Sequence, residues 1–219
     1  YADRDEFVGD PAYVDVPIRE MLAPDYLAAR AALIRPDSAI KNVVAGDPVG
    51  FKPGKDATPD EKGTSHFSIV DQFGNVVSMT TTVESVFGSQ RMAHGFILNN
   101  QLTDFSAMPR DEAGNLIANR PGGGKRPRSS MGPHIVFGED GQFDFATGSP
   151  GGSSIIAYVA KTIVAMIDWG MSPDEAASLA NVISRNGSVR LEEGKLDEQI
   201  IRGLENMGHK VVRSKGEIS

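Results

Sequence analysis

Cysteine is absent from this sequence of 219 residues, which excludes disulfides, thiolate catalysis and zinc sites built on cysteine. Positive charge is scarce: 22 Lys and Arg stand against 29 Asp and Glu, so there is no general electrostatic case for binding nucleic acid. No apolar run reaches the roughly 18 residues needed to span a membrane. Since no two of the four histidines have the spacing of ligands on one helix face, we expect no metal site.

The residues that are present suit a globular fold with a core. Hydrophobic residues make up 40% and charged residues 23%, and the length allows one large domain or two small ones. The polar, acidic start (Tyr1–Glu6) has no features of a signal peptide, and the end (Lys215–Ser219) has no closing element. We expect the sequence to be a fragment, so a missing leader does not indicate a compartment.

The pattern of apolar residues and breakers predicts strand pairs followed by helices. Residues 1–22 are expected to be irregular, and residues 45–63 to be an exposed, mobile linker rich in charge, Pro and Gly. The apolar helix at 153–168 is expected to be buried between layers. Because strand pairs precede the helices that must cover them, the order is typical of an α+β layered fold. Further helices are predicted at 23–33, 172–180 and 197–207, and strands at 66–71, 76–82, 96–98, 134–138, 142–147, 188–191 and 210–212.

The first strand pair places two threonines close together. A turn at Asp71–Asn75 separates two β-rich runs, which predicts a hairpin whose paired positions sum to about 146. Thr64 and Thr82 satisfy this sum. We therefore expect their hydroxyls to be neighbours.

The dipeptide Gly63-Thr64 opens this hairpin and follows the predicted linker. A threonine hydroxyl needs a base to act as a nucleophile at neutral pH, and an adjacent free α-amine can be that base. Thr64 would gain such an amine if the Gly63–Thr64 bond were cut. Gly63 also permits the unusual backbone geometry that attack by Thr64 on its own upstream carbonyl requires. The alternative is a structural threonine that simply opens a strand.

Three other polar segments are candidates for binding groups. The glycine-rich stretch Gly148–Ser153 between a strand and a helix is either an oxyanion-binding loop or a tight turn, and it lacks the lysine of a nucleotide-binding P-loop. The stretch Arg126–Ser130 is either a site for a carboxylate ligand or a solvated basic turn. Residues 99–104, with Asn99, Asn100, Gln101 and Asp104, either contact an ammonium or amide group or form a polar turn.

Together these segments resemble the γ-glutamyltransferase (γ-glutamyltranspeptidase) family of N-terminal nucleophile hydrolases. The resemblance covers residues 1–219, with residues 1–63 similar to the C-terminal tail of a large subunit and its cleavage linker, and 64–219 similar to a small catalytic subunit truncated at its C-terminus. The matching segments, in the family's order, are Thr64–Asp71, Gly74–Ser78, Phe87-Gly88, Gly95–Ser106, Lys125–Pro133 and Gly148–Gly152.

The resemblance implies a partial αββα sandwich and a precursor that cleaves itself at Gly63–Thr64. It implies that Thr64 then attacks the γ-glutamyl amide of glutathione or a related donor, and that the acyl group passes to water or to an amine or peptide acceptor. No cofactor is implied, and the large subunit of the same precursor is the implied partner. A periplasmic or extracellular location is favoured, with a cytoplasmic one also open. The implied roles are hydrogen bonding to the nucleophile for Thr82, the oxyanion hole for Gly151 and Gly152, and donor binding for Ser129, Ser130, Gln101 and Asp104.

Position 84 departs from the family pattern and leaves alternatives open. Two residues after Thr82, where well-studied members carry Asn, this sequence has Glu84. The resemblance makes Glu84 a donor contact, and its carboxylate would favour a cationic amine. The variant also resembles members similar to cephalosporin (glutaryl) acylases, which act by the same mechanism. A third possibility is an unprocessed, non-catalytic binding domain.

Overall fold

The computed structural model describes residues 1–59 and 63–215, which form two compact units built from non-contiguous segments. The first unit comprises residues 1–59, 102–128 and 182–215, and the second comprises residues 63–101 and 129–181. Residues 1–59 and 182–215 share a unit although the predicted subunit boundary at Gly63–Thr64 separates them. Residues 60–62 of the predicted linker lie outside the described residues.

The second unit begins with the predicted hairpin. Strand β1 (Ser65–Val70) pairs antiparallel with β2 (Val76–Thr81), and Ser65 lies opposite Thr81, which confirms the predicted register. The turn is closed by Asp71, whose carboxylate accepts hydrogen bonds from the side chain and backbone of Asn75 and from the backbone of Phe73. These hydrogen bonds, led by that of the Asn75 side chain, hold the pKa of the Asp71 carboxyl below its usual value.

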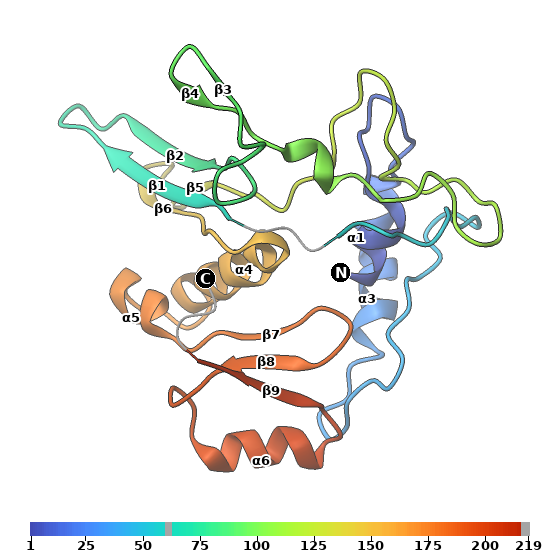
Figure 1. Ribbon diagram of the computed structural model, residues 1–219. Helices are drawn as coiled ribbons and strands as arrows, with labels where there is room; N and C mark the ends of the chain where they lie inside the picture. Colours follow the sequence, from blue (N-terminus) through green and yellow to red (C-terminus); the bar gives the residue numbers. More distant parts are fainter. Residues whose placement is uncertain (60–62, 216–219) are drawn as a thin grey trace. The chain divides into compact units, whose positions relative to one another are not determined.

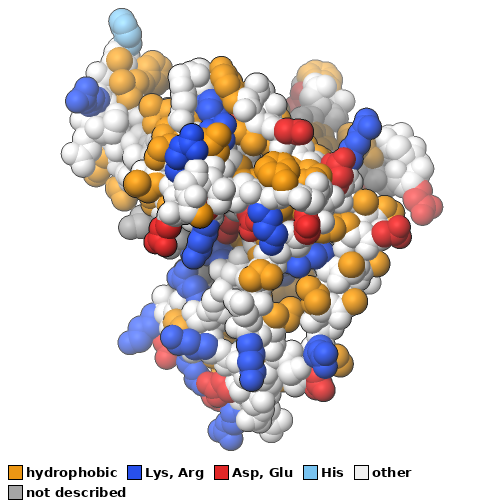
Figure 2. Space-filling view, turned by 90° about the vertical axis from the view of Figure 1, so that its right-hand side faces the viewer, with side chains coloured by type: hydrophobic (Ala, Val, Ile, Leu, Met, Phe, Trp, Pro, Cys, Tyr) orange, Lys and Arg blue, Asp and Glu red, His pale blue; other side chains and the backbone are white. Residues whose placement is uncertain are grey.

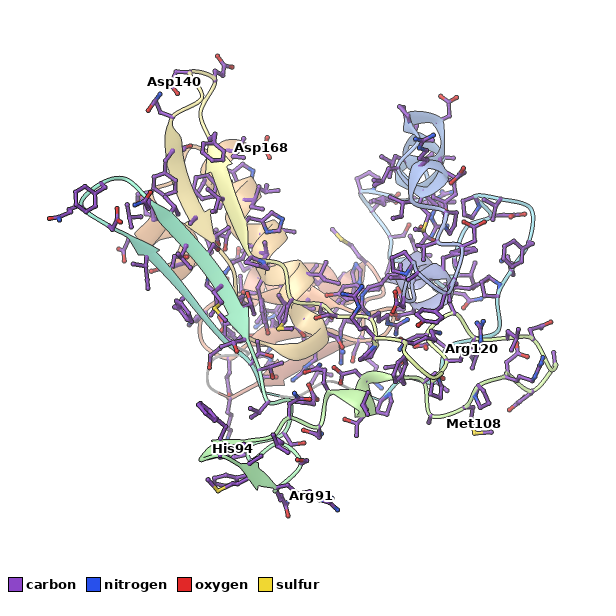
Figure 3. The ribbon with its side chains drawn as sticks, turned by 90° about the horizontal axis from the view of Figure 1, so that it is seen from above. Arg91, His94, Met108, Arg120, Asp140 and Asp168 are labelled. Atoms are coloured by element: carbon purple, nitrogen blue, oxygen red, sulfur yellow. The ribbon has the colours of Figure 1, made fainter. Side chains whose placement is uncertain are left out.

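A second hairpin lies beside the first, as Figures 1 and 3 show. It pairs β5 (His134–Phe137) with β6 (Phe143–Thr147), and Figure 3 labels Asp140 in its turn. The Ser78 hydroxyl of β2 donates to the Thr147 carbonyl of β6 at 3.3 Å, which links the two hairpins. A short hairpin of β3 (Met92–Ala93) and β4 (Phe96–Ile97), which carries the labelled Arg91 and His94 in Figure 3, follows the first.

Helix α4 (Ile155–Ile167) follows a single 3₁₀ turn, η2 (Gly152–Ser154), and packs against β6 and α5 (Pro173–Ser178). One face of α4 is buried through Ile155, Tyr158, Val159 and Ala165. The opposite face is open to solvent, with Ile167 57% exposed, so the prediction of a helix buried between layers is wrong for that face within the described residues.

Helix α5 starts as its sequence predicts. The Ser172 hydroxyl accepts from the backbone of Glu175, and the Glu175 carboxylate accepts from the backbone of Ser172, which completes a capping box with Pro173 at the first position. The hydrogen bonds from Ser172 also lower the pKa of the Glu175 carboxyl.

The first unit contains a three-stranded sheet backed by a helix. Strand β8 (Val189–Glu192) lies between the antiparallel β7 (Val182–Ser184) and the parallel β9 (Val211–Ser214). Helix α6 (Glu198–Asn206), capped by Asp197, lies along one face of this sheet (Figure 1). Val189, Leu191 and Ile201 form the buried core between them.

The N-terminal region of the first unit is more regular than predicted. It contains α1 (Ala2–Phe7), α2 (Ile18–Met21) and α3 (Pro24–Ala31), and only the last of these was expected. Both α1 and α2 are short, and Phe7 is the one buried side chain of α1, so neither carries the apolar periodicity that predicts a helix. A 3₁₀ turn, η1 (Gln101–Asp104), lies at the predicted polar segment.

Part of the predicted linker is fixed rather than free. The backbone of Gly54 donates to the Leu116 carbonyl at 2.8 Å, and the backbone of Ala107 donates to the Ala57 carbonyl at 3.1 Å. Gly54 is buried, so the prediction of an exposed segment is wrong there. The linker charges do not predict these bonds because the partners lie about fifty residues or more further along the chain.

Many large hydrophobic side chains are exposed, and Figure 2 shows such side chains among charged ones on one face of the molecule. On the hairpin β1–β2 four of them share one side: Phe67 is 42%, Ile69 54%, Val77 48% and Met79 46% exposed. None of the helices in the described ranges 1–59 and 63–215 is long and apolar enough to cross a membrane.

Candidate active site

The carbonyl of Gly63, in the peptide bond that joins it to Thr64, is the centre of the candidate site. Its oxygen accepts a hydrogen bond from the Thr64 hydroxyl at 2.6 Å and another from the Thr82 hydroxyl at 2.5 Å. A carbonyl oxygen has two lone pairs, and two hydroxyl donors therefore satisfy it fully. In the uncut chain Thr82 thus hydrogen-bonds the Gly63 carbonyl and not the Thr64 hydroxyl.

The hairpin register brings these groups together. Side chains alternate along a strand, so every second residue lies on the same face. Thr64 continues one face of β1 and Thr82 continues the matching face of β2, one position beyond the Ser65–Thr81 pair. The other polar members of this face are His66, Ser68, Ser78 and Thr80.

The Thr82 hydroxyl also accepts a hydrogen bond from the backbone of Glu84, two residues further along the chain. The backbone N–H of Glu84 donates to the Thr82 hydroxyl at 2.8 Å, and that hydroxyl donates to the Gly63 carbonyl. The chain Glu84 N–H to Thr82 O–H to Gly63 carbonyl is cooperative, because each bond polarises the next. The arrangement strengthens Thr82 as a donor toward the carbonyl oxygen.

Two residues beside the carbonyl have left-handed backbone conformations. Gly63 has φ +76°, and a Cβ at this position would collide with the carbonyl oxygen of Glu84. Glu84 has φ +73° and is buried, an uncommon conformation for a residue with a side chain. For a residue other than glycine this conformation costs of order 1–3 kcal/mol, and such residues concentrate at functional sites.

His66 lies on the same face and connects the hairpin to the glycine-rich loop. Its Nδ1 lies 2.8 Å from the Thr80 hydroxyl and its Nε2 lies 3.2 Å from the Ser68 hydroxyl. Burial lowers the pKa of His66 below its usual value, which favours the neutral ring. A Cβ at Gly148 would collide with this ring, so only glycine lets the loop approach so closely. A cavity of about 480 Å³ borders this face of the hairpin, β6 and α4.

The glycine-rich loop leads into the N-terminus of η2 and α4. Gly151 has φ +126° and Gly152 has φ +55°, both in the region that favours glycine. A Cβ at Gly151 would collide with the ring of Tyr158, which packs beneath the loop. The backbone N–H groups of such a loop are unobstructed by side chains and suit an anion or oxyanion.

The candidate donor-binding residues are distributed over both units. Ser129 is exposed, and its hydroxyl accepts from the backbone of Met131 at 3.1 Å, whereas Ser130 is buried. Gln101 starts η1 in the second unit, where its backbone donates to the Asn99 side chain at 2.9 Å. Asp104 ends η1, is buried and belongs to the first unit.

The cations of the predicted basic turn are engaged by the chain's own carboxylates. Arg128 is buried and forms ion pairs with Asp56 at 2.7 Å and with Asp5 at 3.2 Å. Arg126 lies 3.8 Å from Asp10, and its backbone donates to the same carboxylate at 2.9 Å. Arg128 is therefore neither part of a solvated turn nor available to a carboxylate ligand, because the two carboxylates of the first unit already neutralise its charge.

Asn119 is a buried polar residue that the sequence did not point to. Asn119 is 1% exposed, and its side-chain amide hydrogen-bonds to three separate segments. It follows Ile117-Ala118 in an irregular loop, where neither periodicity nor a breaker draws attention to it. In the part of the chain that the structure describes, no group of three or more His, Asp or Glu residues is arranged to hold a metal ion.

Comparison with known proteins gives the class and then the family. A cephalosporin acylase from Bacillus halodurans matches 97% of this chain and 36% of its own, with TM-score 0.79 at 22% identity. A Helicobacter pylori gamma-glutamyltranspeptidase mutant matches 68% of this chain and 84% of its own, with TM-score 0.61 at 34% identity. The fold is that of the N-terminal nucleophile hydrolases, the αββα class, present here in part.

The family follows from the sequence comparisons. The family model Gamma-glutamyltranspeptidase matches residues 1–219. A glutathione hydrolase proenzyme from Bacillus subtilis is 39% identical over all of this chain, and an acylase ACY 1 proenzyme from Pseudomonas is 35% identical over 98% of it. The chain belongs to the gamma-glutamyltranspeptidase family. It spans 38% of the length of the Bacillus relative.

Proposed function

We propose that this chain is part of an autoprocessing γ-glutamyl acyl transferase or hydrolase in which Thr64 is the nucleophile. The observation that carries the proposal is the Gly63 carbonyl, whose oxygen receives the hydroxyls of both Thr64 and Thr82. Family membership adds support, since the Bacillus relative is a hydrolase made as a proenzyme. The other subunit of the proposed enzyme is the large subunit of the same precursor, to which residues 1–63 contribute the C-terminal tail.

The first proposed reaction is self-cleavage. The Thr64 hydroxyl oxygen attacks the Gly63 carbonyl carbon, the carbon–nitrogen bond breaks, and the hydroxyl proton passes to the departing amine nitrogen. Thr82 and the backbone behind it stabilise the negative charge that develops on the carbonyl oxygen. Water then hydrolyses the resulting ester, which leaves a carboxylate on Gly63 and a free amine and hydroxyl on Thr64.

The second proposed reaction is acyl transfer by the new N-terminus. The α-amine of Thr64, with an ordinary pKa near 8, takes the proton of the Thr64 hydroxyl as it attacks a γ-glutamyl amide. Thr82 orients this hydroxyl, and the backbone N–H groups of Gly151 and Gly152 hold the oxyanion. The acyl group then passes to water or to an amine or peptide acceptor.

The donor's glutamyl group is proposed to be held by polar groups from several segments. Ser129 and Ser130 would bind its α-carboxylate, while Gln101, Asp104 and Glu84 would surround its α-amino group. A cationic ammonium matches two carboxylates, and hydroxyl donors match a carboxylate. The remote ends of the donor are thereby fixed while the amide carbonyl faces the nucleophile.

The test is to express the full-length protein and to sequence the N-terminus of any small subunit that appears. We expect two subunits, with Thr64 as the first residue of the smaller one, and release of p-nitroaniline from γ-glutamyl-p-nitroanilide. Thr64→Ala should remain uncut and inactive. The matched control is Ser65→Ala, which removes the next hydroxyl along the chain, on the opposite face of β1. A precursor that stays intact in wild-type form would support a non-catalytic binding domain instead.

A second candidate function is an acylase of the same mechanism that prefers glutaryl side chains. The observation that favours it is the 35% identity to an acylase proenzyme, together with Glu84, the position at which this sequence departs from the family pattern. Rates on γ-glutamyl and glutaryl p-nitroanilides separate the two, because the substrates differ in the α-amino group. A strong glutaryl preference displaces the first function, and a strong γ-glutamyl preference displaces the second.

A further inference from the structure

The side chain of Asn119 uses both of its polar atoms inside the first unit. Its Nδ2 donates to the Thr58 hydroxyl at 2.8 Å and to the Asp104 carbonyl at 2.7 Å, and its Oδ1 accepts from the backbone of Arg128 at 3.0 Å. The residue is 1% exposed, so water is not an alternative partner for these groups. One amide therefore joins three segments that lie 61, 15 and 9 residues from it in sequence.

Each of the three segments leads to a part of the proposed active site. Thr58 lies six residues before Thr64 on the upstream side of the proposed cleavage. Asp104 is a proposed donor-binding residue at the end of η1. Arg128 directly precedes Ser129 and Ser130, the proposed carboxylate-binding pair.

The upstream segment is held at three successive residues. The Asp56 carboxylate receives the buried guanidinium of Arg128 at 2.7 Å and the Thr58 hydroxyl at 2.7 Å. Between them the Ala57 carbonyl accepts from the backbone of Ala107 at 3.1 Å. Breaking one member of a buried, connected set of this kind leaves its partners unpaired, which costs more than the bond itself contributes.

We propose that Asn119 is a positioning residue that ties the segment upstream of Gly63–Thr64 to the two segments bearing Asp104 and Ser129-Ser130. The inference rests on the proposed function. Only an uncharged amide supplies two donors and an acceptor from one short side chain. An aspartate at this position keeps the acceptor for Arg128 but loses both donors, and it places a negative charge beside the Asp104 carbonyl.

The three bonds act at different stages of the proposed reaction. The bond to Thr58 holds the upstream segment, so its loss should slow self-cleavage and leave the cleaved enzyme unchanged. The bonds to Asp104 and Arg128 hold donor-binding segments, so their loss should weaken donor binding after cleavage. Global destabilisation would lower the number of active sites that can be labelled, without changing KM at the sites that remain, while a displaced binding segment raises KM at every site.

The experiment uses the full-length precursor and compares wild type, Thr58→Val, Asn119→Asp and the control Asn42→Asp, which changes an exposed asparagine. The rate of Gly63–Thr64 cleavage is followed by mass spectrometry, and KM and kcat for γ-glutamyl-p-nitroanilide are measured per labelled active site. Thr58→Val should cleave about tenfold more slowly and then show wild-type KM and kcat, since losing this buried hydrogen bond should lower about tenfold the fraction of precursor whose upstream segment is correctly placed. Asn119→Asp should cleave more slowly and show KM raised about tenfold.

The outcomes distinguish a failure of the positioning role of Asn119 from a failure of the proposed function. If the wild type neither cleaves nor hydrolyses the donor, the proposed function fails. If the wild type does both and Asn119→Asp retains its cleavage rate and KM, the positioning role of Asn119 is wrong. Should Asn119→Asp not fold, Thr58→Val decides the matter at a half-buried position, where a wild-type cleavage rate overturns the inference.

Discussion

Replacing Thr82 with valine is the most direct test of the carbonyl at the centre of the site. Valine keeps the shape and β-branching of threonine but removes the hydroxyl that donates to the Gly63 oxygen at 2.5 Å. The same change leaves the backbone N–H of Glu84 without its acceptor. The β1–β2 pairing does not depend on this side chain, because it is made by backbone groups of residues 65–70 and 76–81.

The size of the effect depends on when the hydrogen bond is strongest. A neutral hydrogen bond contributes about 0.5–1.5 kcal/mol in the resting state, and a bond of unchanged strength in the transition state leaves the barrier unaltered. A preorganised donor to a developing oxyanion contributes about 2.7–4 kcal/mol, which is roughly 10²–10³ in rate. Self-cleavage of Thr82→Val should therefore be slower than wild type by about two to three orders of magnitude.

The assay is a time course of the purified full-length precursor, with the intact chain and both products quantified by mass spectrometry. Thr81→Val is the matched control, because Thr81 is exposed, lies on the opposite face of β2 and pairs with Ser65. It should cleave at the wild-type rate, and Thr82→Ser should retain most of that rate. Cleavage of Thr82→Val within about threefold of wild type would refute the reasoning, because so small a change is worth less than about 1 kcal/mol.

Two further predictions concern glycine and histidine. Gly63→Ala should slow self-cleavage, because alanine disfavours φ +76° and its Cβ would push the carbonyl of Glu84 away. Mass spectrometry of the precursor measures the cleavage rate, and a rate equal to that of the wild type would contradict this prediction. Burial lowers the pKa of His66 below its usual 6.5, so the unfolded chain takes up this proton first and the free energy of unfolding should fall as pH drops below about 6.5. Denaturant titrations between about pH 5 and 8 measure this free energy of unfolding. It should depend less steeply on pH in His66→Gln than in the wild type or in the exposed control His134→Gln. The same pH dependence in all three proteins would contradict the role given to His66.

Features fixed by neighbouring residues were predictable from the sequence. The hairpin register follows from one turn and strict alternation, and these two features suffice to place Thr82 beside Thr64. The capping box of α5 follows from residue types three positions apart. In both cases the interacting groups are close in sequence, so the geometry of the element determines the contact.

Features that join distant segments were not predictable in the same way. The charges of Asp56 and Arg128 suggested a solvated linker and a basic turn, but the two side chains meet and bury one another. Asn119 carries no local signal, since its partners are set by how three loops fold together. The short helices α1 and α2 were missed because helices of one or two turns depend on tertiary contacts more than on propensity.

The doubly hydrogen-bonded carbonyl of Gly63 also has a spectroscopic consequence. Two hydroxyl donors draw electron density toward its oxygen and weaken the carbon–oxygen double bond, so its stretching vibration should lie below that of ordinary peptide carbonyls. A carbon-13 label confined to Gly63 would isolate this band in the infrared spectrum. On cleavage the labelled group would become a carboxylate, which absorbs at a different infrared frequency. The rate of self-cleavage could then be followed by infrared spectroscopy without separating the products.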